Sequence, residues 1–213
     1  MFRGLLLAAC LGTIGMAVSA QTPRAEILET KVICEEQGRY IGWPTVCLTK
    51  AGKLLVAFSG DRDQHVCPWG KSQMVTSDDQ GKTWSAPVTI NSTPLDDRDT
   101  GLLETSKGTL LLTWFTSVAF DKKPEYARTS EKITPELREE WLGFWTRRST
   151  DGGVTWQKAV RMAASAPRGS IQLRHGRLMQ MGKVQGGERA LVAETSTDDG
   201  QSWQVIGSVP IPS

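Results

Sequence analysis

Features that mark several classes of protein are missing from this sequence. It contains only two histidines, His65 and His175, and no Cys-x-x-Cys pair, so we expect no zinc site, no other metal and no cofactor. The formal net charge is +2 and the basic residues are scattered, which argues against a nucleic-acid partner. After the first twenty residues no apolar run is long enough to span a bilayer, and no low-complexity tract or interdomain linker occurs. The architecture must therefore be inferred from internal repeats.

The N-terminus has the composition of a secretory signal. Arg3 supplies the positive charge that opens such signals, a mostly apolar stretch follows, and small residues up to Ala20 form a cleavage site. We predict a signal peptide over residues 1–20 and a secreted or periplasmic mature domain over residues 21–213. One alternative for the apolar stretch is a membrane anchor. Another is a lipoprotein cleaved before Cys10, although that cysteine comes early in the chain.

Three cysteines remain in the mature chain, and export permits a disulfide between two of them. Cys34 and Cys47 lie on consecutive predicted strands and could pair, which would leave Cys67 free. The sequence leaves this pairing open.

An octapeptide with the pattern Ser-x-Asp-x-Gly-x-Thr/Ser-Trp occurs three times, at residues 77–84, 149–156 and 196–203. In each copy the aspartate can cap backbone N–H groups across a tight turn, the glycine can adopt positive φ, and the tryptophan can bury its ring beside the turn. The residues that we assign to this structural role are Ser77, Asp79, Gly81 and Trp84 in the first copy, Ser149, Asp151, Gly153 and Trp156 in the second, and Ser196, Asp198, Gly200 and Trp203 in the third.

Each octapeptide joins two further strands and follows a hairpin with its own glycine turn, at residues 44–58, 101–114 and 170–181. The repeating unit is therefore four antiparallel strands. Three such units predict an all-β protein made of three β-propeller blades. Propellers usually close with four to eight blades, so we expect further C-terminal blades in the full-length protein.

Two segments fall outside this repeat. Residues 26–35 are predicted to form an outer strand. A short helical insertion is predicted near residues 134–143, where Thr134 suits an N-cap and Pro135 suits the first helical turn.

The strand order also predicts where chemistry would lie. In a four-stranded meander the octapeptide turns share one face with the hairpin turns, while the longer loops open on the other face. Loops over a rigid frame commonly carry function. Within residues 59–71 and 91–100 we interpret Asp63 and His65 as groups for proton transfer, Arg62, Arg98, Asp97 and Asp99 as substrate-binding groups, and Trp69 as a stacking platform. Solvated loops with local ion pairs, or a turn that enters a strand, are the alternatives.

The octapeptides resemble the Asp-box, or bacterial neuraminidase repeat, of the sialidase superfamily. The resemblance extends to the Lys-x-Gly-x-Leu-Leu hairpin that leads to Ala57-Phe-Ser-Gly-Asp-Arg62, and to Thr146-Arg-Arg-Ser149 at the start of the second box. It covers nearly the whole mature chain. It implies that these three blades are half of a six-bladed propeller, and that the partner is a glycan or glycoside, most simply an acidic one.

Two residues expected of a sialidase are not found. Gly42 stands where the family has a first-strand arginine that holds the substrate carboxylate, and residues 65–71 contain no acid/base aspartate. A register shift would let Arg62 and Asp63 replace them. Three functions therefore remain open: an exo-sialidase-type glycoside hydrolase or a divergent relative for another acidic sugar, a uronic-acid lyase that uses His65, and a non-catalytic glycan- or protein-binding propeller.

Overall fold

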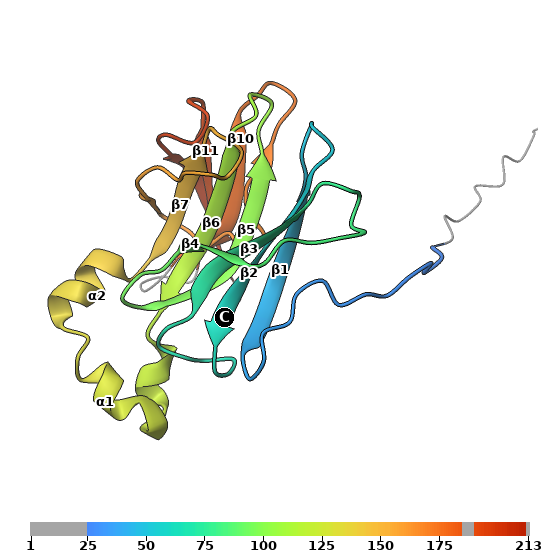
Figure 1. Ribbon diagram of the computed structural model, residues 1–213. Helices are drawn as coiled ribbons and strands as arrows, with labels where there is room; N and C mark the ends of the chain where they lie inside the picture. The colour runs from blue at the N-terminus through green and yellow to red at the C-terminus, as the bar shows by residue number, and fades with distance from the viewer. Residues whose placement is uncertain (1–24, 185–189, 212–213) are drawn as a thin grey trace, which may run out of the picture. The chain divides into compact units, whose positions relative to one another are not determined.

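The computed structural model describes residues 25–184 and 190–211, so the predicted signal peptide lies outside the described residues. Residues 25–31 belong to a separate unit and contain no helix or strand. The second unit, which begins at Val32, contains all of the helices and strands (Figure 1). No strand forms between residues 25 and 36, so the outer strand predicted at 26–35 is wrong for this structure.

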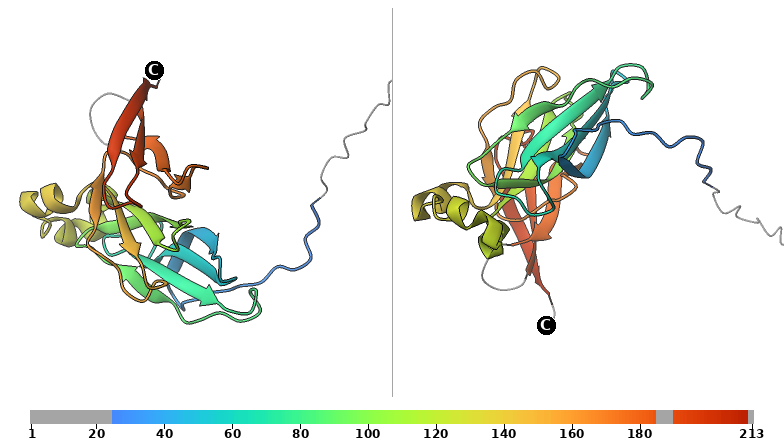
Figure 2. Two further views of the ribbon diagram at one scale, coloured as in Figure 1. Left: turned by 90° about the horizontal axis from the view of Figure 1, so that it is seen from above. Right: turned by 60° about the horizontal axis from the view of Figure 1, so that its bottom comes forward.

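Three four-stranded antiparallel sheets follow one another along the chain, which confirms the predicted blades. In each sheet the hydrogen-bonded neighbours are consecutive strands. In Figure 2 the sheets follow the colour bar from blue-green through yellow to red. The strands are β1 (Tyr40–Leu48), β2 (Leu54–Arg62), β3 (Lys71–Ser77) and β4 (Val88–Asn91); β5 (Asp96–Glu104), β6 (Leu110–Ser117), β7 (Phe144–Ser149) and β8 (Val160–Met162); and β9 (Ile171–Gln172), β10 (Leu178–Lys183), β11 (Ala190–Ser196) and β12 (Gln204–Pro210).

The octapeptide turns share one set of hydrogen bonds. In the first turn the Asp79 carboxylate accepts from Ser77 Oγ at 2.8 Å and from the backbone N–H and hydroxyl of Thr83 at 2.8 and 2.6 Å. Ser77 Oγ in turn accepts from the backbone N–H of the octapeptide's glycine at 2.8 Å. The same bonds recur around Asp151 and Asp198. The predicted structural role of the boxes therefore corresponds to a closed local network.

These hydrogen bonds lower the pKa of the box aspartates. The Thr155 hydroxyl and N–H lower the pKa of Asp151 to about 2. For Asp198 desolvation acts in the opposite direction, but the bonds from Ser202 and Ser196 lower its pKa to about 2. A carboxylate with several donors favours its charged form.

The box tryptophans differ in one respect. The indole N–H of Trp84 donates to the Gly81 carbonyl at 3.0 Å, and that of Trp156 donates to Gly153 at 3.2 Å. The Trp203 indole N–H is buried and has no hydrogen-bond partner within the described residues.

The third box also connects the second and third sheets. Asp199 within it accepts a hydrogen bond from Thr109 of the second blade at 2.6 Å and forms an ion pair with Arg148 at 3.0 Å.

The main core lies between the first and second sheets. Leu55, Ala57 and Met74 of the first sheet pack with Leu112 and with the tryptophans of β6 and β7. Trp114 and Trp145 stack there, with ring centroids 6.4 Å apart and planes 19° apart, and both are buried core residues.

The described cysteines are free thiols. Cys47 belongs to the main core with Leu55, whereas Cys34 packs on the cluster that contains Val56. Because adjacent strand residues point to opposite faces, Cys34 and Cys47 lie on different sides of the first sheet. Cys67 is fully buried, and burial raises the pKa of its thiol.

The segment between β6 and β7 is helical, as predicted. It contains η1 (Ala119–Lys122), η2 (Pro124–Tyr126), α1 (Ala127–Ser130) and α2 (Pro135–Trp141), which project from the sheets in Figure 1. Thr134 Oγ1 accepts the N–H of Leu137 at 3.3 Å and so caps α2. No helix among the described residues is long and apolar enough to cross a membrane.

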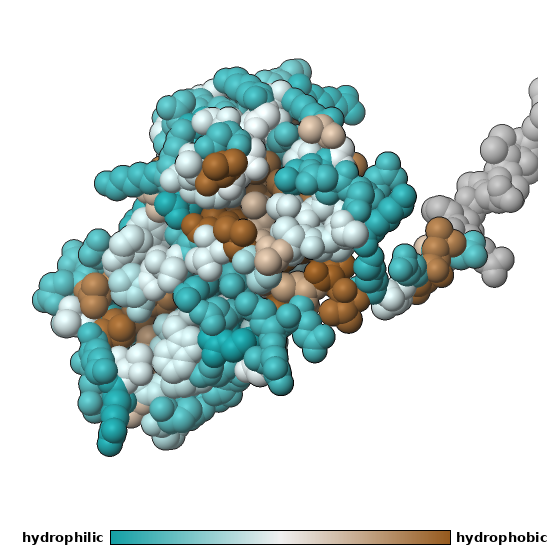
Figure 3. Space-filling view, viewed as in Figure 1, coloured by the Kyte–Doolittle hydropathy of each residue, from teal (hydrophilic) through white to brown (hydrophobic). Residues whose placement is uncertain are grey.

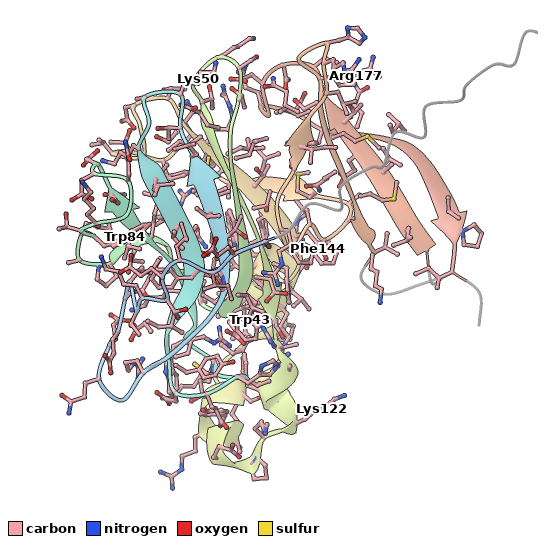
Figure 4. The ribbon with its side chains drawn as sticks, turned by 90° about the vertical axis from the view of Figure 1, so that its right-hand side faces the viewer. Trp43, Lys50, Trp84, Lys122, Phe144 and Arg177 are labelled. Atoms are coloured by element: carbon pink, nitrogen blue, oxygen red, sulfur yellow. The ribbon has the colours of Figure 1, made fainter. Side chains whose placement is uncertain are left out.

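The hairpin turns and the helical insertion lie at different ends of the second unit. Figure 4 shows Lys50 and Arg177, which lie in or beside hairpin turns, at one end, and Trp43 and Lys122 toward the other. The surface in Figure 3 carries small hydrophobic patches among hydrophilic residues rather than one continuous apolar face. The β12 edge strand is exposed at every residue.

Candidate functional site

The strands extend further toward the candidate site than the sequence indicated. Arg62 is the last residue of β2 and pairs with Tyr40 of β1, while Asp96 opens β5 and pairs with Ser117 of β6. The predicted loops 59–71 and 91–100 are therefore shorter than expected. Arg62 and residues 96–99 were assigned to loops but lie within β2 and β5, whereas Asp63 and His65 do lie in the loop between β2 and β3.

A buried ion pair links these two strands. Arg62 and Asp96 are both fully buried, and the guanidinium donates to the two carboxylate oxygens at 2.6 and 3.0 Å. Arg62 also donates to the backbone carbonyls of Asp97 at 3.2 Å and His65 at 2.9 Å. Burial raises the pKa of Asp96, while Arg62 opposes this shift. With no exposed surface, Arg62 fixes the backbone of the site and does not face solvent.

The first strands of the first and second sheets share a backbone irregularity. Trp43 in β1 has φ of 54° and Asp99 in β5 has φ of 51°. The preceding residues, Gly42 and Arg98, are in each case the last paired residues before a register shift. A positive φ costs a residue other than glycine about 1–3 kcal/mol and persists only where its surroundings impose it. Trp43 and Asp99 thus occupy equivalent, strained positions in neighbouring blades.

Arg98 is held between aromatic rings. Its guanidinium carbon lies 5.0 Å from the centroid of Trp43 and 5.8 Å from that of Phe115. Nη2 lies 3.2 Å from Nε2 of the exposed His65, and the His65 ring meets Trp43 edge-on at 4.9 Å. Since a guanidinium only donates, this contact is a hydrogen bond in the tautomer that carries the ring proton on Nδ1 and leaves Nε2 as the acceptor. Nη1 of Arg98 makes no hydrogen bond within the described part of the chain.

One oxygen of the Asp99 carboxylate is buried without a hydrogen-bond donor in the described part of the chain. Its backbone N–H donates to Ser59 Oγ at 2.9 Å, but Oδ1 is buried without a hydrogen-bond partner among the described residues. Burial raises the pKa of Asp99, and the positive charges of Arg98 and Arg168 oppose this shift. A carboxyl group in such a position can hold a proton more readily than a solvated aspartate.

Two further predicted site residues, Asp63 and Asp97, do not contact His65 or Arg98 through their side chains in the described part of the chain. Asp63 is exposed and pairs with Arg39 at 2.6 Å, and no contact joins it to His65 among the described residues. Asp97 is fully buried and accepts from Asn91 Nδ2 at 3.0 Å and from Thr93 N at 2.9 Å. Burial raises the pKa of Asp97 to about 7.

Trp69 is 39% exposed and meets Tyr126 of the insertion edge-on at 5.5 Å. The structure thus brings Arg62, His65, Arg98 and Trp43 into contact, with Asp99 next to Arg98. Asp63 and Trp69 lie outside that set of contacts.

Two residues that contact Arg98 in the candidate site were not predicted from the sequence. Trp43 forms the centre of the cluster, and Phe115 closes the second side of Arg98. A signal for Trp43 was present, because it precedes the turn glycine Gly52 by the same interval as Asp99 precedes Gly108. Within the described residues no group of three or more histidine, cysteine or acidic side chains is arranged to hold a metal ion.

Comparisons with known proteins agree with this architecture. The BNR/Asp-box repeat family model matches residues 75–86 and 147–158, which contain the first two octapeptides. No curated protein matches the sequence. A solved protein of unknown function from Dyadobacter fermentans is 23% identical with a TM-score of 0.67, over 85% of this chain and 58% of that one.

Two enzymes are among the similar structures. The NanB sialidase from Streptococcus pneumoniae is 14% identical with a TM-score of 0.62, over 85% of this chain and 46% of that one. The intramolecular trans-sialidase from Ruminococcus gnavus is 12% identical with a TM-score of 0.54, over 78% of this chain and 60% of that one. This chain therefore spans about half the length of the structures that it matches. It contains BNR/Asp-box repeats, and its three four-stranded sheets have the propeller-blade architecture of these sialidase structures.

Proposed function

We propose that the protein is exported and acts on glycans that carry a carboxylate, as a glycoside hydrolase of sialidase type or a divergent relative. The observation that supports this most directly is the position of Arg98. Its guanidinium is fixed by Trp43 and Phe115, one terminal nitrogen makes no hydrogen bond within the described residues, and an imidazole and a carboxyl group adjoin it.

Arg98 would hold the substrate carboxylate. Ordering by two rings reduces the entropy lost when the side chain binds an anion, because the guanidinium is already immobile. A charge-assisted hydrogen bond of this kind contributes about 1.5–3 kcal/mol. The position also compensates for the missing first-strand arginine, since Arg98 is the second-blade equivalent of Gly42.

Asp99 and His65 would share the proton transfers. A carboxyl group whose pKa is raised by burial can protonate the leaving glycosidic oxygen. When Arg98 turns its donors to the substrate carboxylate, Nε2 of His65 is released and can accept a proton from the attacking water. Different surroundings commonly separate acid and base roles in one site. Arg62 and Asp96 would position this pair through the His65 carbonyl and the start of β5.

A lyase acting on uronic acids is a second candidate, favoured specifically by the contact between His65 and Arg98. In β-elimination the arginine would turn from His65 to neutralise the carboxylate, and the released Nε2 of His65 would remove the C5 proton. The C4–O bond would then break, with the departing oxygen taking up a proton. The two reactions leave different products, because elimination introduces a carbon–carbon double bond that absorbs in the ultraviolet and hydrolysis consumes water without one.

The test is a panel of sialosides, glucuronides and galacturonides with the full-length protein and three variants, Arg98→Gln, His65→Ala and Asp99→Asn. We expect Arg98→Gln to weaken binding by about tenfold to a hundredfold, the fold-change that corresponds to 1.5–3 kcal/mol. His65→Ala and Asp99→Asn should lower turnover more than affinity. The control is His175→Ala, which changes an exposed histidine in a hairpin turn of the opposite end.

Binding without turnover in the unmodified protein would support the non-catalytic alternative and contradict the hydrolase proposal. Binding that is unaffected by Arg98→Gln would place the carboxylate elsewhere and refute the assignment of the site.

A further inference from the structure

A second cleft lies apart from the Trp43 cluster, between the outer strand of the first sheet and the insertion of the second. It has a volume of about 480 Å³ and is lined by residues 89–93 at the end of β4, by the end of α2, by β7 and by the segment before β8. We propose that this cleft binds a saccharide unit, with Trp141 as the stacking surface and Arg147, Lys158 and Glu140 as polar partners.

The aromatic wall of the cleft has one available ring. Trp145 is buried, its indole N–H donates to the Trp141 carbonyl at 3.0 Å, and Arg161 lies over its ring at 4.3 Å. Trp141 is only partly buried, and its indole N–H has no hydrogen-bond partner among the described residues. The C–H groups of a pyranose ring are weakly positive, so they are attracted to the negative face of an indole. Trp141 therefore offers both a flat surface and a free donor.

The polar groups of the cleft complement the hydroxyl groups of a sugar. Arg147 is fixed by bonds from Nη1 to the Ile90 carbonyl at 3.1 Å and to Asn91 Oδ1 at 3.0 Å, and its Nη2 is unpaired within the described residues. The side chains of Lys158 and Glu140 likewise have no partner in that part of the chain. Donors and acceptors thus both face the cleft, which suits hydroxyl groups, since each hydroxyl donates one bond and accepts others.

This composition distinguishes a saccharide from other ligands. A phosphate chain would meet the charge of Glu140 beside only two cations, and an apolar ligand would leave the arginine and lysine desolvated without partners. The hydroxyl groups of a saccharide can pair with the cations and with Glu140, and a uronate would add a carboxylate that can pair with Lys158. Pockets of about 300–1,000 Å³ commonly bind small ligands, so this cleft has room for a sugar unit.

The cleft is physically connected to the candidate catalytic site. Asn91 and Thr93 line it and also hold the buried carboxylate of Asp97, whose neighbour in the chain is Arg98. A glycan bound in the cleft would therefore contact Asn91 and Thr93, the residues that fix the start of β5. The proposal does not depend on catalysis, because the cleft can bind a chain whether or not the Arg98 site acts on it.

The experiment measures binding of neutral and uronate oligosaccharides to the full-length protein by calorimetry and by saturation-transfer NMR. The probes are cello-oligosaccharides, malto-oligosaccharides and oligogalacturonates. The variants are Trp141→Ala, Lys158→Gln and Glu140→Gln. Their controls are Lys132→Gln, an exposed lysine of the insertion, and Glu139→Gln, the exposed neighbour of Glu140 that does not line the cleft.

We expect Trp141→Ala to weaken binding by about tenfold, the fold-change that corresponds to an aromatic stacking contact. Lys158→Gln and Glu140→Gln should each weaken it measurably, with the lysine mattering more for uronates, while both controls bind as the unmodified protein does. Since Trp141 touches the core, the two polar variants keep the test valid if Trp141→Ala folds poorly. The proposal is overturned if none of the probes binds, or if binding survives all three cleft variants and is lost in Arg98→Gln alone. That last outcome would contradict binding in the cleft but support binding at Arg98, so the two proposals can fail independently.

Discussion

Replacing Arg62 by methionine is expected to destabilise the fold strongly at neutral pH. Both members of the Arg62–Asp96 pair are completely buried, and methionine removes four hydrogen bonds from the guanidinium at 2.6–3.2 Å. Removing one partner of a buried ion pair typically costs about 3–5 kcal/mol, because it leaves an uncompensated buried charge.

The cost should depend on pH in a defined direction. Burial raises the pKa of Asp96, and Arg62 is the main group that opposes this shift, followed by the charge of Arg98 and the N–H of Cys67. Without Arg62 the pKa of Asp96 in the folded variant therefore rises further above the unfolded value of about 3.9. Stability of the variant is then fully present below pH ~4 and falls as pH rises toward the raised pKa. At pH 4 the variant should therefore lie closer to the unmodified protein than at pH 7.

Urea unfolding followed by tryptophan fluorescence at pH 4 and pH 7 measures both effects. The double variant Arg62→Met/Asp96→Leu is the matched control, since replacing a buried pair with apolar residues is often neutral or stabilising. If Arg62→Met costs the same at both pH values, or if the double variant is no more stable than the single one at pH 7, the pair does not act as described.

Three further predictions concern stability. Gly70→Ala should destabilise the protein, because a Cβ there would collide with the Arg62 guanidinium and the Asp96 carboxylate. The control Gly207→Ala should be nearly neutral, because a Cβ there meets open space. Thermal unfolding compares the two variants, and equal unfolding midpoints would contradict the close packing at Gly70. Burial raises the pKa of Asp97 to about 7, so its contribution to stability should fall as pH rises from ~4 to ~7, and Asp97→Asn should flatten the pH profile in that window. The lowered pKa of Asp198, about 2, predicts the opposite dependence: stability present above pH ~4 is lost as pH falls toward 2, and an Asp198→Asn variant that keeps this loss would show that another group causes it.

The blade architecture could be predicted because its signals are local. A glycine turn, an octapeptide with its own hydrogen bonds and an alternating strand on either side are contained within a few dozen residues, and the structure confirms them. The helix that begins after Thr134 was found for the same reason, since an N-cap and a following proline are adjacent in sequence.

The errors arose where the stabilising partner is distant. Arg62 and Asp96 were assigned to loops as charged residues, yet each is buried because the other is present, 34 positions away. The strand expected at 26–35 has suitable residues but no partner strand within the described structure. The cluster around Trp43 depends on backbone bulges, which position a side chain without leaving a sequence pattern in a single copy.

The paired bulges at Trp43 and Asp99 have a consequence for how such a protein can change. The same irregular backbone carries Gly42 and an indole in one blade, and a guanidinium and a carboxylate in the next. The conformation is imposed by neighbouring strands rather than by the residue that adopts it, since aspartate tolerates positive φ but tryptophan rarely adopts it. Substitutions at these positions can therefore alter the chemistry presented at the rim while the register of the sheets stays fixed, so ligand preference can diverge between relatives faster than their fold.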